Sequence, residues 1–274
     1  MIPAPFEYVR AGSAEEAVAL VAQHGDEAKF LAGGHSLVPL MKLRLAQPSV
    51  LVDVGRIREL SYVRDAGDHL AIGALTRHMD VETSPLVREH VPLLARAASH
   101  VGDSQVRHRG TIGGSIAHAD PASDLPATTL ALGASYVATG PRGTRTIAAR
   151  DFYRGFLDSV LAADELLVEV RVPKMAGAEW GFQKFVRRAQ DWAIVGVAAW
   201  RRGRDSGVAL VNMGPTPLLA QGAMDALRDG AGVDEASRRA ADGTDPSSDV
   251  NASAEYRAHL ARVLVRRALE GRAT

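Results

Sequence analysis

Arg109-Gly110-Thr111-Ile112-Gly113-Gly114-Ser115 is the most informative segment of this chain, and Asp120, Pro121 and Asp124 follow it closely. Glycines lack a Cβ atom, so the backbone can turn through positive φ and a ligand can approach the peptide N–H groups. Consecutive N–H groups that point into one concavity form a nest for anions, most often phosphate. The hydroxyls of Thr111 and Ser115 can donate to the same oxygens. Taken alone, however, one Gly-Gly pair favours a tight turn between strands.

A second glycine pair lies upstream, in Ala32-Gly33-Gly34-His35-Ser36. It follows a short apolar strand predicted at 30–32, and a helix at 37–45 and a buried strand at 50–54 come after it. This order is typical of a small α/β unit, in which the strand end and the helix N-terminus both favour an anion. Two such loops predict a site that holds a diphosphate from both sides.

Length and charge limit the function classes. The chain has 274 residues, and about 100–200 residues per domain predicts roughly two domains. Lysine plus arginine equals aspartate plus glutamate, 32 against 32, so no net basic field indicates nucleic acid or an anionic membrane. No apolar run has the about 18 residues of a membrane span, and the N-terminus lacks a signal-peptide layout. We therefore expect a cytoplasmic protein without a membrane span.

Cysteine is absent from the sequence. No thiolate is therefore present to hold an iron–sulfur cluster or a cysteine-ligated zinc. The nine histidines are scattered and include no His-x-x-x-His pair, so a metal site is not expected. Any iron–sulfur chemistry connected with this protein must reside on another chain.

The rest of the chain predicts two regions. A capping box, Ser13-Ala14-Glu15-Glu16, starts a helix that Gly25 ends. Between the two glycine segments and Pro173, which marks a strand end and a domain boundary, the pattern mixes helices and strands. Predicted strands are at 62–64, 70–72, 135–139, 145–147 and 165–172, and predicted helices open at 84 and cover 92–99 and 124–132.

Beyond Pro173, strand-like runs with short turns indicate an antiparallel sheet. The runs are at 180–186, 194–200 and 208–213, followed by a helix at 220–227 and a polar loop at 241–249. A basic helix ends the chain, with an inner stripe of Tyr256, Leu260, Val263 and Leu264. Its arginines are expected to be solvated or to face a partner: Arg257, Arg262, Arg266 and Arg267.

No Gly-x-Gly-x-x-Gly and no Gly-Lys-Ser/Thr occurs, so neither the Rossmann nor the Walker phosphate loop is present. Residues 32–54, which begin Ala-Gly-Gly-His-Ser-Leu-Val-Pro-Leu-Met-Lys-Leu-Arg-Leu, resemble the FAD-binding medium subunit of the carbon monoxide dehydrogenase type. Residues 109–126 resemble the second flavin loop of that family, and residues 184–199 are similar to the start of its C-terminal domain. The resemblance covers nearly the whole chain.

The resemblance implies a flavoprotein subunit of a molybdenum hydroxylase in the xanthine dehydrogenase family. The implied fold is α+β: a two-subdomain FAD-binding fold of the vanillyl-alcohol oxidase (PCMH) type, plus a smaller C-terminal α+β domain with an antiparallel sheet. Its expected bounds are 1–175, with subdomains of about 1–55 and 56–175, and 176–274. Implied partners are a large subunit with the molybdenum cofactor and a small subunit with two [2Fe–2S] clusters, in a dimer of heterotrimers. Electrons would pass from the clusters through non-covalent FAD to an external acceptor.

Site residues are carried over from the resemblance by position, and no catalytic acid, base or nucleophile is expected among them. Asp124 matches an acidic flavin contact, although capping a helix is an equal alternative. Lys184 matches a lysine near the flavin, and Gln183 is the alternative if the register differs by one residue. Leu167 packs either on the flavin ring or only in the core, and Leu166 is the alternative for this position. The two loops supply the others: Ala32, Gly33, Gly34, His35, Ser36, Leu37, Thr111, Ile112, Gly113, Gly114 and Ser115.

Two other functions remain open at this point. One is a self-contained flavin oxidase of the same fold, which would need a base over the flavin ring. The other is a nucleotide-binding module without enzymatic activity. His35 also raises the question of covalent flavin attachment, which occurs at such a position in distant relatives of the fold, but the resemblance implies hydrogen bonding instead.

Overall fold

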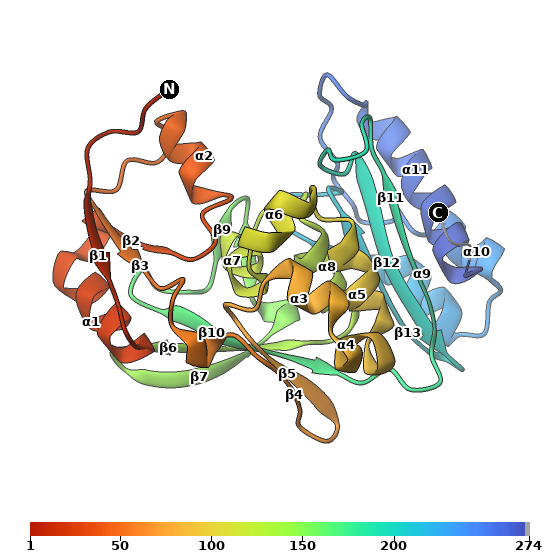
Figure 1. Ribbon diagram of the computed structural model, residues 1–274. Coiled ribbons are helices and arrows are strands. Elements are labelled where there is room, and N and C mark those ends of the chain that lie inside the picture. The colour runs from red at the N-terminus through yellow and green to blue at the C-terminus, as the bar shows by residue number, and fades with distance from the viewer. Residues whose placement is uncertain (272–274) are drawn as a thin grey trace.

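The structure, a computed structural model, describes residues 1–271, so the last three residues of the expected C-terminal domain, 272–274, lie outside the described residues. The three larger sheets and their helices are arranged side by side (Figure 1). None of the helices in the described part of the chain has the length and apolar character needed to cross a bilayer.

The N-terminal part is a three-stranded parallel sheet in the order β1-β3-β2, with α1 packed on it. Ser13 accepts a hydrogen bond from the Glu16 N–H at 3.1 Å and Gly25 ends the helix at φ 59°, so the capping prediction is confirmed. The predicted α/β unit is present too, although α2 is shorter than expected. The elements are β1 (Glu7–Arg10), α1 (Ala14–His24), β2 (Ala28–Leu31), α2 (Leu37–Lys42) and β3 (Val50–Asp53).

The middle part is a five-stranded antiparallel sheet in the order β4-β5-β10-β6-β7, with helices gathered above it (Figure 1). All five of its predicted strands are present. The strands are β4 (Val63–Asp65), β5 (His69–Gly73), β6 (Ser135–Gly140), β7 (Gly143–Ala148) and β10 (Leu166–Pro173), and a small hairpin consists of β8 (Tyr153–Gly155) and β9 (Asp158–Ser159). The helices are α3 (His78–Thr83), α4 (Pro85–His90), α5 (Pro92–Ser99), α6 (Ser104–Arg109), α7 (Ile112–His118) and α8 (Asp124–Ala131).

The C-terminal part is the predicted antiparallel sheet, in the order β11-β12-β13-β14. Its side chains alternate between two cores, as the period of a strand requires. Ala198 and Ala209 face the core that contains α8, whereas Val197 and Leu210 face α9 and α11. The elements are β11 (Glu179–Phe185), β12 (Val195–Arg202), β13 (Asp205–Val211), β14 (Leu218–Leu219), α9 (Gln221–Arg228), α10 (Val233–Arg238) and α11 (Ala254–Leu269).

The inner face of α11 differs from the prediction. Arg257, expected at the surface, is 1% exposed, whereas Tyr256, expected inside, is 45% exposed. The buried stripe runs through Leu260 and Leu264 as predicted, but it continues through Ala261 and Val265 instead of through Tyr256. The buried stripe of the last helix is therefore shifted relative to the predicted one, because Arg257 has hydrogen-bond partners that the apolar pattern does not indicate.

Candidate functional site

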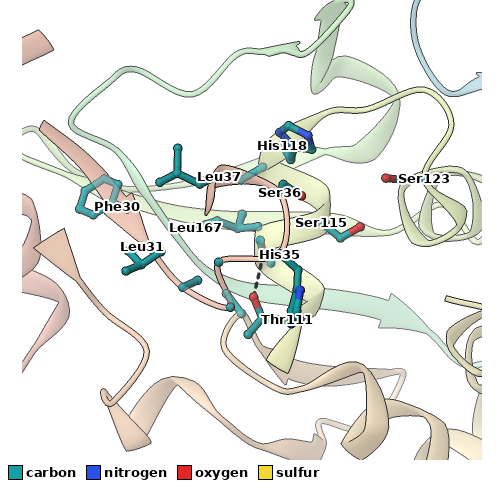
Figure 2. Close-up of a pocket in the computed structure, with 18 of the residues that line it drawn as sticks. Phe30, Leu31, His35, Ser36, Leu37, Thr111, Ser115, His118, Ser123 and Leu167 are labelled. Atoms are coloured by element: carbon teal, nitrogen blue, oxygen red, sulfur yellow. Dashed lines mark hydrogen bonds between the residues drawn. The ribbon is translucent and has the colours of Figure 1, made fainter. Parts of the chain in front are cut away.

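A cavity of about 680 Å³ lies where the N-terminal and middle parts of the chain meet, and β11 and the loop after it contribute to its wall. Both glycine segments line it, and its volume is within the range of cofactor sites. In Figure 2, Phe30, Leu31 and Leu37 lie toward one end of the cavity, and Ser115 and Ser123 lie toward the other. The cavity thus has an apolar end and an end with hydroxyl groups.

The first glycine loop connects β2 to α2 and has the properties of an anion nest. Gly34 has φ 76°, in the left-handed region that favours glycine. The backbone N–H groups of residues 33–36 donate no hydrogen bond to any acceptor within residues 1–271. Exposed N–H groups of this kind, together with a helix start, suit a phosphate oxygen.

The second glycine segment is built differently, and the prediction of positive φ does not hold there. Gly113 and Gly114 lie in the first turn of α7, which is capped by the Thr111 hydroxyl; that hydroxyl accepts a hydrogen bond from the Gly114 N–H at 3.2 Å. The Ile112 side chain is fully buried in the core instead of lining the cavity.

Most N–H groups of this second segment are already used. The N–H of Gly113 donates to the carbonyl oxygen of Ala74 at 2.8 Å, and the N–H of Ser115 donates to that of Thr111 at 3.0 Å. A Cβ atom at Gly113 would lie 2.4 Å from the Cβ of Ala74, so glycine is required here by close packing. This segment therefore contributes a helix N-terminus and the Ser115 hydroxyl, and it is no open nest.

The floor of the cavity includes the start of β10. Leu166 and Leu167 both line the cavity, and they are 7% and 4% exposed. The pairing of β10 with β6 shifts between Leu167 and Glu169, and such a bulge changes the direction of the side chains that follow it. Because both leucines reach the cavity, the choice between them stays open.

Asp124 and Lys184 form a buried ion pair in the cavity wall, with Nζ and Oδ2 2.7 Å apart and side chains 5% and 7% exposed. Lys184 also donates to the carbonyl oxygen of His100 at 2.9 Å, whereas Gln183 does not line the cavity. Burial raises the pKa of Asp124 to about 6 against the opposing effect of Lys184. Asp124 is the first residue of α8 and makes no cap, and its buried Oδ1 has no hydrogen-bond partner among residues 1–271.

Three histidines line the cavity, and each has a lowered pKa, with burial as the main cause. The pKa of His78 falls to about 4, and that side chain is only 4% exposed. His35 is exposed at the tip of the first loop, where Arg109 adds to the effect. The third is His118, at the end of α7. All three are therefore neutral at pH 7, and they offer nitrogen donors and acceptors without charge.

Several cavity residues were missed by sequence reasoning. His78 is a single histidine at the start of α3, and Trp192, 60% exposed, belongs to the loop after β11. Residues 157–159, at the tip of the β8–β9 hairpin, also line the cavity. No spacing links these segments to the glycine loops; of these residues, only Trp192 lies within 184–199, which resembles the start of the family's C-terminal domain.

Two family models match the chain. The FAD binding domain in molybdopterin dehydrogenase matches residues 4–175, and the CO dehydrogenase flavoprotein C-terminal domain matches residues 180–271. The carbon monoxide dehydrogenase medium chain of Hydrogenophaga pseudoflava is 44% identical, over 98% of this chain and 97% of the relative. The 6-hydroxypseudooxynicotine dehydrogenase complex subunit alpha of Paenarthrobacter nicotinovorans is 39% identical, over 98% and 95%.

Solved structures show the same similarity. A carbon monoxide dehydrogenase from Hydrogenophaga pseudoflava, which lacks the Mo-pyranopterin moiety of the molybdenum cofactor, matches with a TM-score of 0.95 at 44% identity, covering 99% of this chain and 98% of the other. Quinoline 2-oxidoreductase from Pseudomonas putida 86 matches with a TM-score of 0.91 at 33% identity, covering 98% and 97%. The similarity therefore extends over both matched domains.

Proposed function

Because the chain belongs to the family of FAD-binding medium subunits of carbon monoxide dehydrogenase-type molybdenum hydroxylases, which are oxidoreductases, we propose that its 680 Å³ cavity holds non-covalent FAD. In this proposal the chain transfers electrons from [2Fe–2S] clusters of a partner subunit to an external acceptor. The supporting observation is the first glycine loop, whose N–H groups at residues 33–36 have no acceptor of their own within residues 1–271.

The residues present fit a dinucleotide. The N–H groups of the first loop and the start of α7 would hold the pyrophosphate, and a side chain at Gly113 would displace the wall of this cradle. Leu37 and Leu167 would pack on apolar parts of the cofactor, and Oδ1 of Asp124 would accept a hydrogen bond from it. Bound FAD would supply one- and two-electron chemistry between the clusters and the acceptor.

The protein groups provide position and electrostatics. The Asp124–Lys184 pair keeps one carboxylate and one ammonium fixed beside the cavity, with no net charge between them. Lys184 Nζ occupies Oδ2 of Asp124, so Oδ1 is the oxygen left to contact a bound cofactor. His35 is neutral and exposed, which suits a hydrogen bond to the cofactor without covalent attachment.

The substrate is expected to be chosen elsewhere in the complex. Relatives of similar identity are named for unrelated substrates: carbon monoxide at 44%, 6-hydroxypseudooxynicotine at 39% and glyceraldehyde at 41%. A subunit that selected the substrate would diverge among them, so we place substrate oxidation at molybdenum on a large subunit. We also place the clusters on a small subunit, following the resemblance; this chain has no cysteine to ligate them.

For the domains, we propose 1–175 for FAD binding, with subdomains of about 1–55 and 56–175, and 176–274 for the C-terminal domain. The first family match ends at residue 175 and the second begins at residue 180, which supports this division. We also propose a cytoplasmic dimer of heterotrimers, following the resemblance.

The test compares the chain alone with the chain assembled with its iron–sulfur and molybdenum subunits. Each sample is mixed anaerobically with carbon monoxide, aldehydes and N-heterocycles, and the flavin absorbance is followed. We expect bleaching only in the assembled protein, and yellow colour in the supernatant after acid precipitation. Bleaching of the chain alone would favour the self-contained oxidase, and absence of flavin in the assembled protein would favour a nucleotide-binding module.

A further inference from the structure

A second cavity, of about 560 Å³, adjoins the proposed FAD cavity along the first glycine loop. The two share residues 31–35. The rest of the second cavity is lined by Tyr8 of β1, by α2, by the end of β3 with the loop after it, and by the residues just before α3 and α7.

Four cationic side chains line this second cavity and come from four separate segments: Lys42, Arg56, Arg77 and Arg109. None of them forms an ion pair within residues 1–271, and Asp53 is the only carboxylate among the lining residues. The whole chain has 32 basic and 32 acidic side chains, so the excess of positive charge in this cavity is local. Like charges gathered in one hollow repel each other and attract an anion.

The single carboxylate and the central arginine are both held in place by hydrogen bonds. Asp53 accepts from the Tyr8 hydroxyl on one oxygen and from the Gly55 N–H, at 2.7 Å, on the other. The half-buried Arg77 donates to the carbonyl oxygens of Arg109 and Gly55, the latter at 3.4 Å, and to no carboxylate in the described part of the chain. Burial and the nearby Arg109 lower the pKa of Arg77, against the opposing effects of Asp80 and Asp53.

We propose that this cavity is a second anion site, separate from the FAD cavity, which binds a phosphate group. Arginine presents planar, paired N–H donors that match phosphate oxygens, and four cations against one carboxylate suit a doubly charged group better than a carboxylate. Inorganic phosphate and the phosphate of a nucleotide present the same oxygens to these arginines, and the two arms of the test distinguish them. A concave pocket of this size favours a small ligand over the surface of a partner protein.

The test uses the assembled, FAD-loaded protein, titrated by calorimetry with inorganic phosphate and, in a second arm, with AMP. We expect saturable binding of one ligand per chain that weakens as salt rises. Arg56→Gln and Arg109→Gln should each weaken it roughly tenfold, because each removes a charge-assisted contact. Arg58→Gln is the matched control, since Arg58 is exposed in the same loop and does not line the cavity. Tighter binding of AMP would identify a nucleotide, and equal or tighter binding of phosphate would identify the free ion.

Three results would overturn the proposal. The first is the absence of saturable binding of both ligands. The second is binding that Arg56→Gln and Arg109→Gln leave unchanged. The third is release of FAD in proportion to the bound phosphate, because the ligand would then occupy the FAD cavity. Flavin absorbance, recorded during each titration, separates this last result from binding at the second cavity.

Discussion

Gly33 faces the backbone of Arg109 so closely that a Cβ atom at Gly33 would lie 2.3 Å from the Arg109 carbonyl oxygen. The first glycine loop thus packs directly against the segment that leads into α7. The contact is between two stretches of main chain, so no side-chain rotation can relieve an added atom. It fixes the distance between the two walls of the proposed pyrophosphate site.

The first prediction is that Gly33→Ala separates these walls. Overpacking of this kind costs about 1–3 kcal/mol of stability, and we expect FAD occupancy of the assembled protein to fall well below that of the wild type. Gly232→Ala is the control, because a Cβ there meets nothing within 4 Å. Flavin content per chain, measured after denaturation, gives the result. Full occupancy in Gly33→Ala would show that the walls do not hold the cofactor.

The second prediction concerns the buried pair. Lys184→Met leaves the Asp124 carboxylate buried without its partner and should cost about 3–5 kcal/mol in the free energy of unfolding. The double variant with Asp124→Asn should recover part of this loss. Arg188→Met is the control; its partner is Asp191, its side chain is 82% exposed, and an exposed pair is worth about 0–1 kcal/mol. Equal losses from Lys184→Met and Arg188→Met in urea denaturation would contradict the prediction.

The two glycine pairs show what the sequence can predict and where its information ends. By sequence both pairs are typical of nests with positive φ, but only the first pair has such a residue, at Gly34. Gly113 is glycine because Ala74, far away in sequence, lies against it. The sequence shows where a side chain is absent. It does not show whether the backbone conformation or the packing of a distant segment requires glycine there.

Strands and capped helices were predictable because their signals are local. Strand β1 was missed, since it is short, carries mostly exposed side chains and is held only by pairing with β3. The buried position of Arg257 was also missed, because its partners are Asp249 and the carbonyl oxygen of Ile194. Both features depend on contacts between segments that are distant in sequence, and hydrophobic periodicity does not predict such contacts.

The third prediction follows from the low pKa of His78. This side chain is neutral when folded and must take up a proton on unfolding once the pH is below its ordinary value of 6.5. Its contribution to stability is therefore present above pH 6.5 and is lost as the pH falls toward 4, by about 3 kcal/mol in all. His78→Gln, which does not titrate, should show a correspondingly smaller loss between pH 7 and pH 4. Parallel stability curves for the two proteins would refute the assignment.

The last prediction is that Arg257 holds the loop that carries Trp192. Its guanidinium donates to the Ile194 carbonyl oxygen and pairs with Asp249 at 2.8 Å, so α11 fixes the segment that continues into the cavity wall. Arg257→Met should cost about 1–3 kcal/mol in stability, since it removes a buried donor from the Ile194 carbonyl oxygen, whereas Asp249 is 42% exposed and can be solvated. Hydrogen exchange of residues 188–194 should accelerate as well. Arg267→Met, exposed on the same helix, is the control. Unchanged exchange in this loop would limit Arg257 to a purely local role in α11.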